Sequence, residues 1–374
     1  MSKVGIFSIE LFTPTAKFVA REGFLSGNKF FCLYKKIPSS DFSKLHISEF
    51  RPSFVVRFIS FISRRLDLVW WHGSRRTGKR MIDVMSGQGI NTILCHFGPS
   101  GVEIQRYLGN KNLKIIVVFH GYDISKLLRY KSYRKALKKI GGDSRFHARL
   151  VADYLVEDIR PFFPLERTHV IKNGVEFNKM NDSFSKIRSN RKDFIYFQGA
   201  NLVEKKGHQY VLQAFSKLPI DIKNSSVVVF AGSGRLKASL IKMAKDLSIY
   251  DRVQFMGHLS GNEYQSLLDN CDCFIHPSVK DSNDETEGIP TAIIEAMAKS
   301  KLVLSTRHAG IPELVEHGIT GLLVEERDVD KLVEYMIWIQ TNEEDCRIIA
   351  NKARDFVHRE FSLDRMFLEY QKIL

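Results

Sequence analysis

Residues 286–298 read TEGIPTAIIEAMA, and this stretch sets the interpretation of the rest of the chain. Two carboxylates, Glu287 and Glu295, stand eight positions apart and flank a glycine, a proline and an apolar run. Proline has a fixed φ and no N–H, so it is favoured where a helix begins. The pattern therefore predicts a helix that starts near Pro290 and runs through Ala298, with Glu287 in the preceding loop.

The chemistry of this junction points to a ligand with both charge and hydroxyl groups. A helix N-terminus carries about half a positive charge and several free amides, which favours an anion. Two acidic side chains beside an anion would repel it, so Glu287 and Glu295 better suit the neutral hydroxyls of the same ligand, as in a nucleotide sugar. The alternative is a solvated helix with an acidic first turn. Glu295 argues against that alternative, because a carboxylate among apolar neighbours is costly without a partner.

Length and composition limit the class of protein. A chain of 374 residues exceeds the usual size of one hydrophobic core, so two domains are expected. The five scattered cysteines suit a reducing cytosol. The opening residues read as a short strand, so no secretory signal is expected, and no run approaches the roughly 20 apolar residues of a membrane span. The net charge of +14 would attract nucleic acid, acidic polysaccharide or anionic lipid alike.

Short β-branched runs alternate with longer helical patterns, which is typical of parallel α/β sheets. The boundary between two such sheets is expected in residues 171–191, and ligands in these sheets bind at the carboxyl ends of strands. The expected strands of the first half are residues 4–8, 29–33, 92–96, 113–119 and 150–156. Those of the second half are residues 194–199, 226–231, 253–256, 273–276, 302–305 and 321–324.

The stretch from Arg51 to Trp71 combines aromatic and aliphatic residues at helical spacing with interspersed arginines. Such a segment can lie at a membrane interface, with aromatics among the headgroups and arginines on anionic lipid. It can equally be a core helix with solvated arginines. The sequence leaves both interpretations open.

Several expected strand ends carry polar residues. His120 follows a buried strand in the sequence HGYD, where it would donate a hydrogen bond to a substrate oxygen or, if charged, stabilise negative charge. A structural role is the alternative. His96 repeats the pattern at an earlier strand end.

The second half offers phosphate-binding candidates at its own strand ends. Lys205 and Lys206 lie in a strand-to-helix turn suited to a diphosphate, although a solvated lysine pair is the alternative. Gly232 begins a G-x-G sequence that permits close approach of a ligand, which is a weak signal alone. Gly310 follows another strand and would supply amides.

Other motifs read as structural. Cys271 and Cys273 supply only two metal ligands and are expected in the core. Asp328 is expected to cap a helix rather than to hold a metal. Residues 361–374 have the apolar spacing of a docking helix.

Together these motifs resemble the retaining glycosyltransferases of family 4, which have the two-domain GT-B fold. The matching features are the E-x7-E spacing of Glu287 and Glu295, LVEKKG at residues 202–207, NGV at 173–175, HGYD at 120–123 and GIPE at 310–313. They follow the family's order over most of the chain. The pair FHGYD and HFGP most resembles the subgroup that builds bacterial colanic acid, capsules and O-antigens.

The resemblance implies an α/β fold of two Rossmann-like domains, residues 1–172 and 173–360, that face each other across a cleft, with a helix at 361–374 returning to the first domain. It implies that Glu287 contacts hydroxyls of the donor sugar and Glu295 the ribose. Lys206 and amides near Gly288 and Ile289 would hold the diphosphate, and His120 would approach the transferred sugar.

The resemblance further implies retention of anomeric configuration with no metal and no cofactor. Asn201 stands where the family usually has arginine, a change that would forgo roughly 1.5–3 kcal/mol of diphosphate binding. We expect Asn201, Gly232 and Gly310 to line the donor site with the groups above.

The sequence thus predicts a transferase that moves a sugar from a UDP- or GDP-sugar to a lipid-linked oligosaccharide of a bacterial surface polysaccharide. Its partners would be the nucleotide sugar, the lipid-linked glycan and an anionic membrane surface, at the cytoplasmic face, with no nucleic acid. Two alternatives are a sugar-nucleotide epimerase on the same fold and a basic protein that binds membranes or nucleic acid. Neither would need an acceptor sugar.

Overall fold

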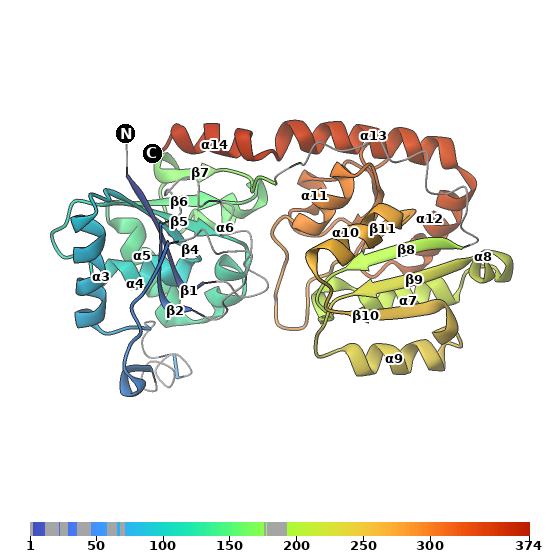
Figure 1. Cartoon of the computed structure of the whole chain (residues 1–374), viewed down its shortest axis with the longest axis horizontal. Coiled ribbons are helices and arrows are strands. Elements are labelled where there is room, and N and C mark those ends of the chain that lie inside the picture. Colours follow the sequence, from blue (N-terminus) through green and yellow to red (C-terminus); the bar gives the residue numbers. More distant parts are fainter. Residues whose placement is uncertain are drawn as a thin grey trace. The chain divides into compact units, whose positions relative to one another are not determined.

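The computed structural model describes residues 3–11, 22, 29–35, 46–57, 66–67, 72–175, 177 and 193–374 (Figure 1). The chain forms two compact units. Unit 1 comprises Met1–Gly174 together with Met366–Leu374, and unit 2 comprises Val175–Arg365. The sequence predicted domain boundaries between residues 172 and 173 and between residues 360 and 361. In the structure the chain passes from one unit to the other between residues 174 and 175 and again between residues 365 and 366.

Unit 1 is built on a parallel sheet of seven strands in the order β3-β2-β1-β4-β5-β6-β7, with helices packed against it (Figure 1). Its strands are β1 (Val4–Leu11), β2 (Lys29–Lys35), β3 (His46–Glu49), β4 (Thr92–His96), β5 (Lys114–Phe119), β6 (Phe146–Leu150) and β7 (Thr168–Val170). Its helices are α3 (Arg75–Gly87), α4 (Gly98–Gln105), α5 (Lys131–Gly142) and α6 (Val156–Ile159).

One expected strand of unit 1 was wrong. The strand lies at Phe146–Leu150, and the residues expected to form it at 150–156 instead enter a 3₁₀ turn (Asp153–Leu155) and helix α6. The true strand carries His147 and Arg149, so its pattern looked less apolar than the run that follows. Strands β3 and β7 were not expected at all.

Unit 2 repeats the design with six parallel strands in the order β10-β9-β8-β11-β12-β13. Its strands are β8 (Phe194–Gly199), β9 (Ser226–Ala231), β10 (Val253–Gly257), β11 (Cys273–His276), β12 (Leu302–Thr306) and β13 (Leu322–Val324). Its helices are α7 (His208–Ser216), α8 (Ile220–Asn224), α9 (Lys237–Asp246), α10 (Gly261–Asn270), α11 (Thr291–Ala298), α12 (Val329–Thr341) and α13 (Glu343–Glu360). Helix α14 (Leu363–Gln371) begins in unit 2, and its residues from Met366 on belong to unit 1. The expected strands of this half are all confirmed to within a residue at either end.

Burial explains why these strands form where the sequence placed them. Every residue of β4, β9, β11 and β12 is buried, as expected of parallel strands covered on both faces. Cys271 and Cys273 are buried free thiols, which confirms their assignment to the core. Asp328 caps α12 by accepting the amide of Lys331 at 2.9 Å, which confirms that prediction.

The C-terminal helix α14 ends in unit 1. Tyr370 is fully buried there, and the Lys114 ammonium donates to the carbonyl of Ile373 at 2.6 Å. This confirms the expected return of the last helix to the first domain. Among the described residues, no helix combines the length and apolar character needed to cross a bilayer.

Candidate functional site

The strand order of unit 2 reverses between β8 and β11. The chain leaves β8 toward β9 on one side, and β11, β12 and β13 follow on the other side. Loops at the carboxyl ends of the two central strands diverge at such a point and leave a crevice where α/β proteins bind ligands. Lys206 follows β8, and the loop to Glu287 follows β11, so the predicted donor-binding residues flank this point.

Lys206 and Glu287 form an ion pair. The Lys206 Nζ lies 2.8 Å from Glu287 Oε1, and the two side chains are only 16% and 8% exposed. Burial alone would raise the pKa of Glu287, but the charges of Lys206 and Lys205 outweigh it and lower the pKa to about 2. Glu287 is therefore a carboxylate at neutral pH and is unsuited to act as a proton donor.

Two neutral histidines lie within the electrostatic influence of the same ammonium. His276 Nε2 lies 3.5 Å from Lys206 Nζ, and burial and Lys206 hold the pKa of His276 well below its usual range. His208 begins α7, and burial and Lys206 lower its pKa to about 3. Since both imidazoles are uncharged, the positive charge here belongs to the lysines.

Helix α11 begins as predicted, with Pro290 as its N-cap. The preceding amides of Gly288 and Ile289 make no hydrogen bond within the described part of the chain, so both can donate to a ligand. Gly310 lies against this loop, since a Cβ on Gly310 would lie 2.7 Å from the carbonyl oxygen of Gly288. Glu295 is half-buried in the helix.

The loop that carries Lys206 depends on Gly207. Gly207 has a φ of +69°, and a Cβ there would lie 1.9 Å from the carbonyl oxygen of Pro277. The predicted close approach at Gly232 is also real, but its partner is the protein, because a Cβ there would meet the carbonyl oxygen of Ala200 at 1.9 Å. Asn201 is exposed in the neighbouring turn.

In unit 1, His120 follows β5 as predicted, and Asp123 holds its loop. Asp123 Oδ1 accepts the amide of His120 and Oδ2 accepts the amide of Gly98, both at 2.8 Å. Asp123 thereby links the loop of HGYD (residues 120–123) to that of HFGP (residues 96–99) by hydrogen bonds. Burial raises the pKa of Asp123 to about 6, although its backbone hydrogen bonds oppose that rise.

His120 belongs to a buried polar cluster at these strand ends. Its Nε2 lies 3.2 Å from His96 Nδ1, and His96 Nε2 lies 3.3 Å from Glu22 Oε2. Burial, His96 and Arg149 hold the pKa of His120 well below its usual range. His120 is thus neutral at pH 7, which favours the hydrogen-bonding role over the charged one.

Glu22 connects this cluster to the end of the chain. The Tyr370 hydroxyl of α14 donates to Glu22 Oε2 at 2.8 Å, and Arg149 Nη1 lies 3.4 Å from Glu22 Oε1. Burial would raise the pKa of Glu22, but His96 and Arg149 lower it overall. Sequence reasoning missed Glu22, Arg149 and Tyr370. The sequence offered two signals for this cluster, the polar Arg149 inside β6 and Tyr370 in the C-terminal helix.

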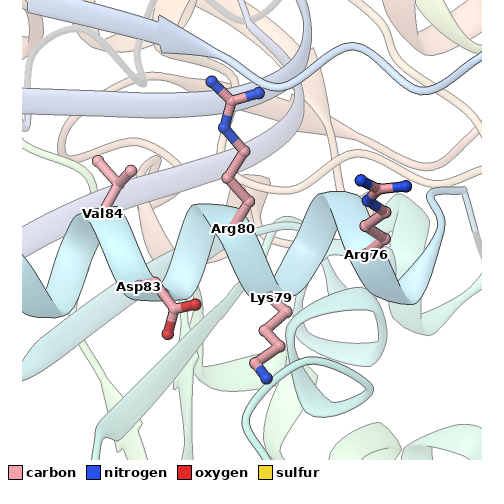
Figure 2. A pocket seen from close by; sticks show the side chains of 5 residues that line it. All are labelled: Arg76, Lys79, Arg80, Asp83 and Val84. Atoms are coloured by element: carbon pink, nitrogen blue, oxygen red, sulfur yellow. The ribbon is translucent and has the colours of Figure 1, made fainter.

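A surface hollow of about 510 Å³ lies elsewhere in unit 1, on α3. Figure 2 shows Arg76 and Arg80 extending from one side of the helix and Lys79 from the other, and Asp83 and Val84 complete the lining. The hollow shares no residue with the two groups above. It is a basic surface rather than part of either strand-end site.

Part of the stretch from Arg51 to Trp71, for which the sequence left an interfacial and a core helix open, is also exposed. Phe54 is 77% and Val55 62% exposed, so these two side chains are not core residues. Residues 58–65 and 68–71, which include Trp70 and Trp71, lie outside the described residues, as do 178–192 around the expected boundary. No group of three or more metal-ligating side chains is present among the described residues.

The two Rossmann-like parallel sheets and the returning C-terminal helix are the architecture of the GT-B glycosyltransferases. The crystal structure of Anabaena HepE with UDP-glucose has this fold, with a TM-score of 0.77, 15% identity and coverage of 99% of both chains. Residues 179–356 match the family described as Glycosyl transferases group 1. The chain belongs to this family, as predicted.

Two curated relatives support that membership. The amylovoran biosynthesis glycosyltransferase AmsK of Erwinia amylovora is 29% identical over 284 residues, which are 75% of this chain and 69% of AmsK. WcaL of Escherichia coli, named for colanic acid biosynthesis, is 30% identical over 281 residues, 73% of this chain and 67% of WcaL. The activity class is therefore that of a glycosyltransferase.

Proposed function

We propose that the protein transfers a sugar from a UDP- or GDP-sugar to a lipid-linked glycan during synthesis of a bacterial surface polysaccharide. The observation that carries the proposal is the meeting of Lys206, Glu287 and the open amides of Gly288 and Ile289 at the switch point of unit 2. A diphosphate needs cations and N–H donors, and a sugar needs a carboxylate acceptor. The names of AmsK and WcaL support the polysaccharide context.

In the proposed reaction the bond from the anomeric carbon to the diphosphate breaks, and a bond to an acceptor hydroxyl forms on the same face. The hydroxyl proton passes to the leaving phosphate oxygen, so no side chain is required as a base. Lys206 and the amides of Gly288 and Ile289, which precede α11, stabilise the departing charge without a metal ion. Neutral His120 donates a hydrogen bond to the transferred sugar, while Glu295 holds the ribose.

The test compares wild-type protein with Glu295→Ala. Thermal-shift screening against a panel of UDP- and GDP-sugars should select a donor, and Glu295→Ala should weaken its binding and abolish transfer while circular dichroism stays unchanged. NMR of the product should show the anomeric configuration of the donor. Unchanged turnover in the variant would refute the assignment of a glycosyltransferase site to Glu295. A chemically altered sugar in reactions that contain the donor alone would favour the epimerase.

We further propose that unit 1 binds anionic membrane, where the lipid-linked acceptor lies. Support comes from the basic side chains of α3, Arg76 and Arg80 on one side of the helix and Lys79 on the other (Figure 2). Further support comes from the exposed Phe54 and Val55. Each Lys or Arg near an anionic surface contributes roughly 1 kcal/mol. Arg76→Ala/Lys79→Ala/Arg80→Ala should therefore lose co-sedimentation with phosphatidylglycerol vesicles. Equal binding of wild-type and variant protein to these vesicles would exclude this face.

A further inference from the structure

Three polar groups from separate segments of unit 2 form a chain behind Glu287. The backbone N–H of Glu287 donates to His308 Nε2 at 3.2 Å. His308 Nδ1 in turn lies 2.6 Å from Glu326 Oε1. Glu287 precedes α11, His308 follows β12 and Glu326 follows β13, so each loop comes from a different strand. His308 is only 2% exposed.

The contacts fix the tautomer of His308. A backbone amide can only donate, so His308 Nε2 must present its lone pair to Glu287. The ring proton then lies on Nδ1, where the Glu326 carboxylate accepts it. Each partner of the imidazole thus requires the same tautomer, and the ring is held at both ends.

Glu326 is itself held in place. Its Oε2 accepts the amide of Lys280 at 2.9 Å and lies 3.1 Å from Arg327 Nη1. Burial would raise the pKa of Glu326, but the hydrogen bonds from His308 and from the Lys280 amide lower it overall. The carboxylate therefore links the start of the loop at Lys280 to the histidine that holds its end at Glu287.

The middle of this loop has a separate anchor. Asp281 Oδ1 accepts the amides of Asn283 and Glu285, both at 2.8 Å. The loop from Lys280 to Glu287 is thus closed at its start and middle by Glu326 and Asp281. At its functional end, His308 supplies the hydrogen bond to the Glu287 amide.

We propose that His308 and Glu326 are positioning residues that orient Glu287 toward the sugar of the donor. The inference rests on the proposed function, in which the Glu287 carboxylate accepts from sugar hydroxyls. Fixing the amide of Glu287 restricts the backbone from which that carboxylate projects, and a misplacement of about 1 Å can cost on the order of 100-fold in rate. The nucleoside diphosphate depends less on this pair, because Lys206 and Glu295, which hold it together with the Gly288 and Ile289 amides, lie outside the loop from Lys280 to Glu287.

The experiment compares His308→Leu with His308→Gln. Leucine removes both hydrogen bonds, whereas a glutamine amide can accept from Glu287 and donate to Glu326. A matched control is His317→Leu, because His317 Nδ1 accepts the amide of Leu323 instead, at 3.0 Å. Hydrogen exchange of the Glu287 amide is measured without ligand, and calorimetry measures binding of UDP and of UDP-glucose, or of GDP and the GDP-sugar if the panel selects one.

His308→Leu should expose the Glu287 amide to exchange and weaken nucleotide-sugar binding about 10- to 100-fold. Binding of the nucleoside diphosphate should change far less, and His308→Gln should restore both protection and affinity. The proposal is overturned if the Glu287 amide stays protected in His308→Leu, or if His317→Leu reproduces the same loss of sugar selectivity. If wild-type protein binds no nucleotide sugar, the proposed function fails, while exchange at Glu287 still decides the positioning role.

Discussion

Replacing Lys206 by methionine tests the electrostatic account of the candidate site. The substitution removes the ammonium 2.8 Å from Glu287 Oε1 and leaves a buried carboxylate with its desolvation cost. The folded-state pKa of about 2, against an ordinary 4.5, corresponds to about 3 kcal/mol of stability at pH 7. We expect Lys206→Met to lose a large part of this amount, because Lys206 is the largest of the charges that lower this pKa and Lys205 supplies a further part.

The pH dependence of this loss has a definite sign. The pKa of Glu287 is depressed in the folded state, so its contribution is fully present above pH 4.5 and is lost as pH falls through about 2. The difference between wild-type and variant protein should therefore shrink by about 1 kcal/mol between pH 7 and pH 4, and further below that. Adding Glu287→Gln should recover much of the lost stability, because the buried carboxylate is then replaced by a neutral amide.

Urea unfolding followed by tryptophan fluorescence measures the effect. The chain has three tryptophans, and Trp338 packs against the core of unit 2. Substituting phenylalanine for Trp70 and Trp71 makes Trp338 the reporter of that unit. An unfolding free energy equal to that of wild type at pH 7, or a loss that does not change with pH, would refute the assigned pairing.

Three shorter predictions concern other contacts. Gly207→Ala should lower the free energy of unfolding of unit 2 by more than about 1 kcal/mol in the same assay, because φ is +69° and the new Cβ would meet Pro277. Tyr370→Phe should destabilise unit 1 by about 1–3 kcal/mol, seen as faster hydrogen exchange in β4 and β6, since buried Glu22 loses a donor. Asn201→Arg should tighten UDP or GDP binding measured by calorimetry, and an unchanged dissociation constant would place that turn outside the diphosphate site.

Much of the fold follows from local patterns in the sequence. Parallel strands covered on both faces need continuous apolar runs, which is why β4, β8, β9 and β11 were located to the residue. The same rule failed at β6, where Arg149 and His147 interrupt the run. Strand β7 is three half-buried residues long and carries too little apolar signal to be found.

The candidate site was predictable in its positions but not in its pairings. The helix start at Pro290 and the strand end before His120 follow from local chemistry. The contact between Tyr370 and Glu22 joins residues 348 apart, and nothing in the local sequence of either encodes it. The same holds for Lys206 and Glu287, which come together only because β8 and β11 are neighbours in the sheet.

The ion pair between Lys206 and Glu287 changes the expected electrostatics of the candidate site. From the sequence alone, Glu287 had to avoid the phosphate because like charges repel. In the structure its charge is balanced by Lys206, so the pair is neutral as a unit. In the proposed complex, a diphosphate would draw Lys206 toward itself, and sugar hydroxyls would donate to the carboxylate that the lysine leaves. A nucleotide sugar supplies both exchanges, whereas a free nucleoside diphosphate supplies only the first and returns no hydrogen bond to Glu287 for the lysine that it draws away. The ion pair therefore favours the intact donor over the bare nucleotide, and it does so with the two residues that the E-x7-E and LVEKKG motifs supply.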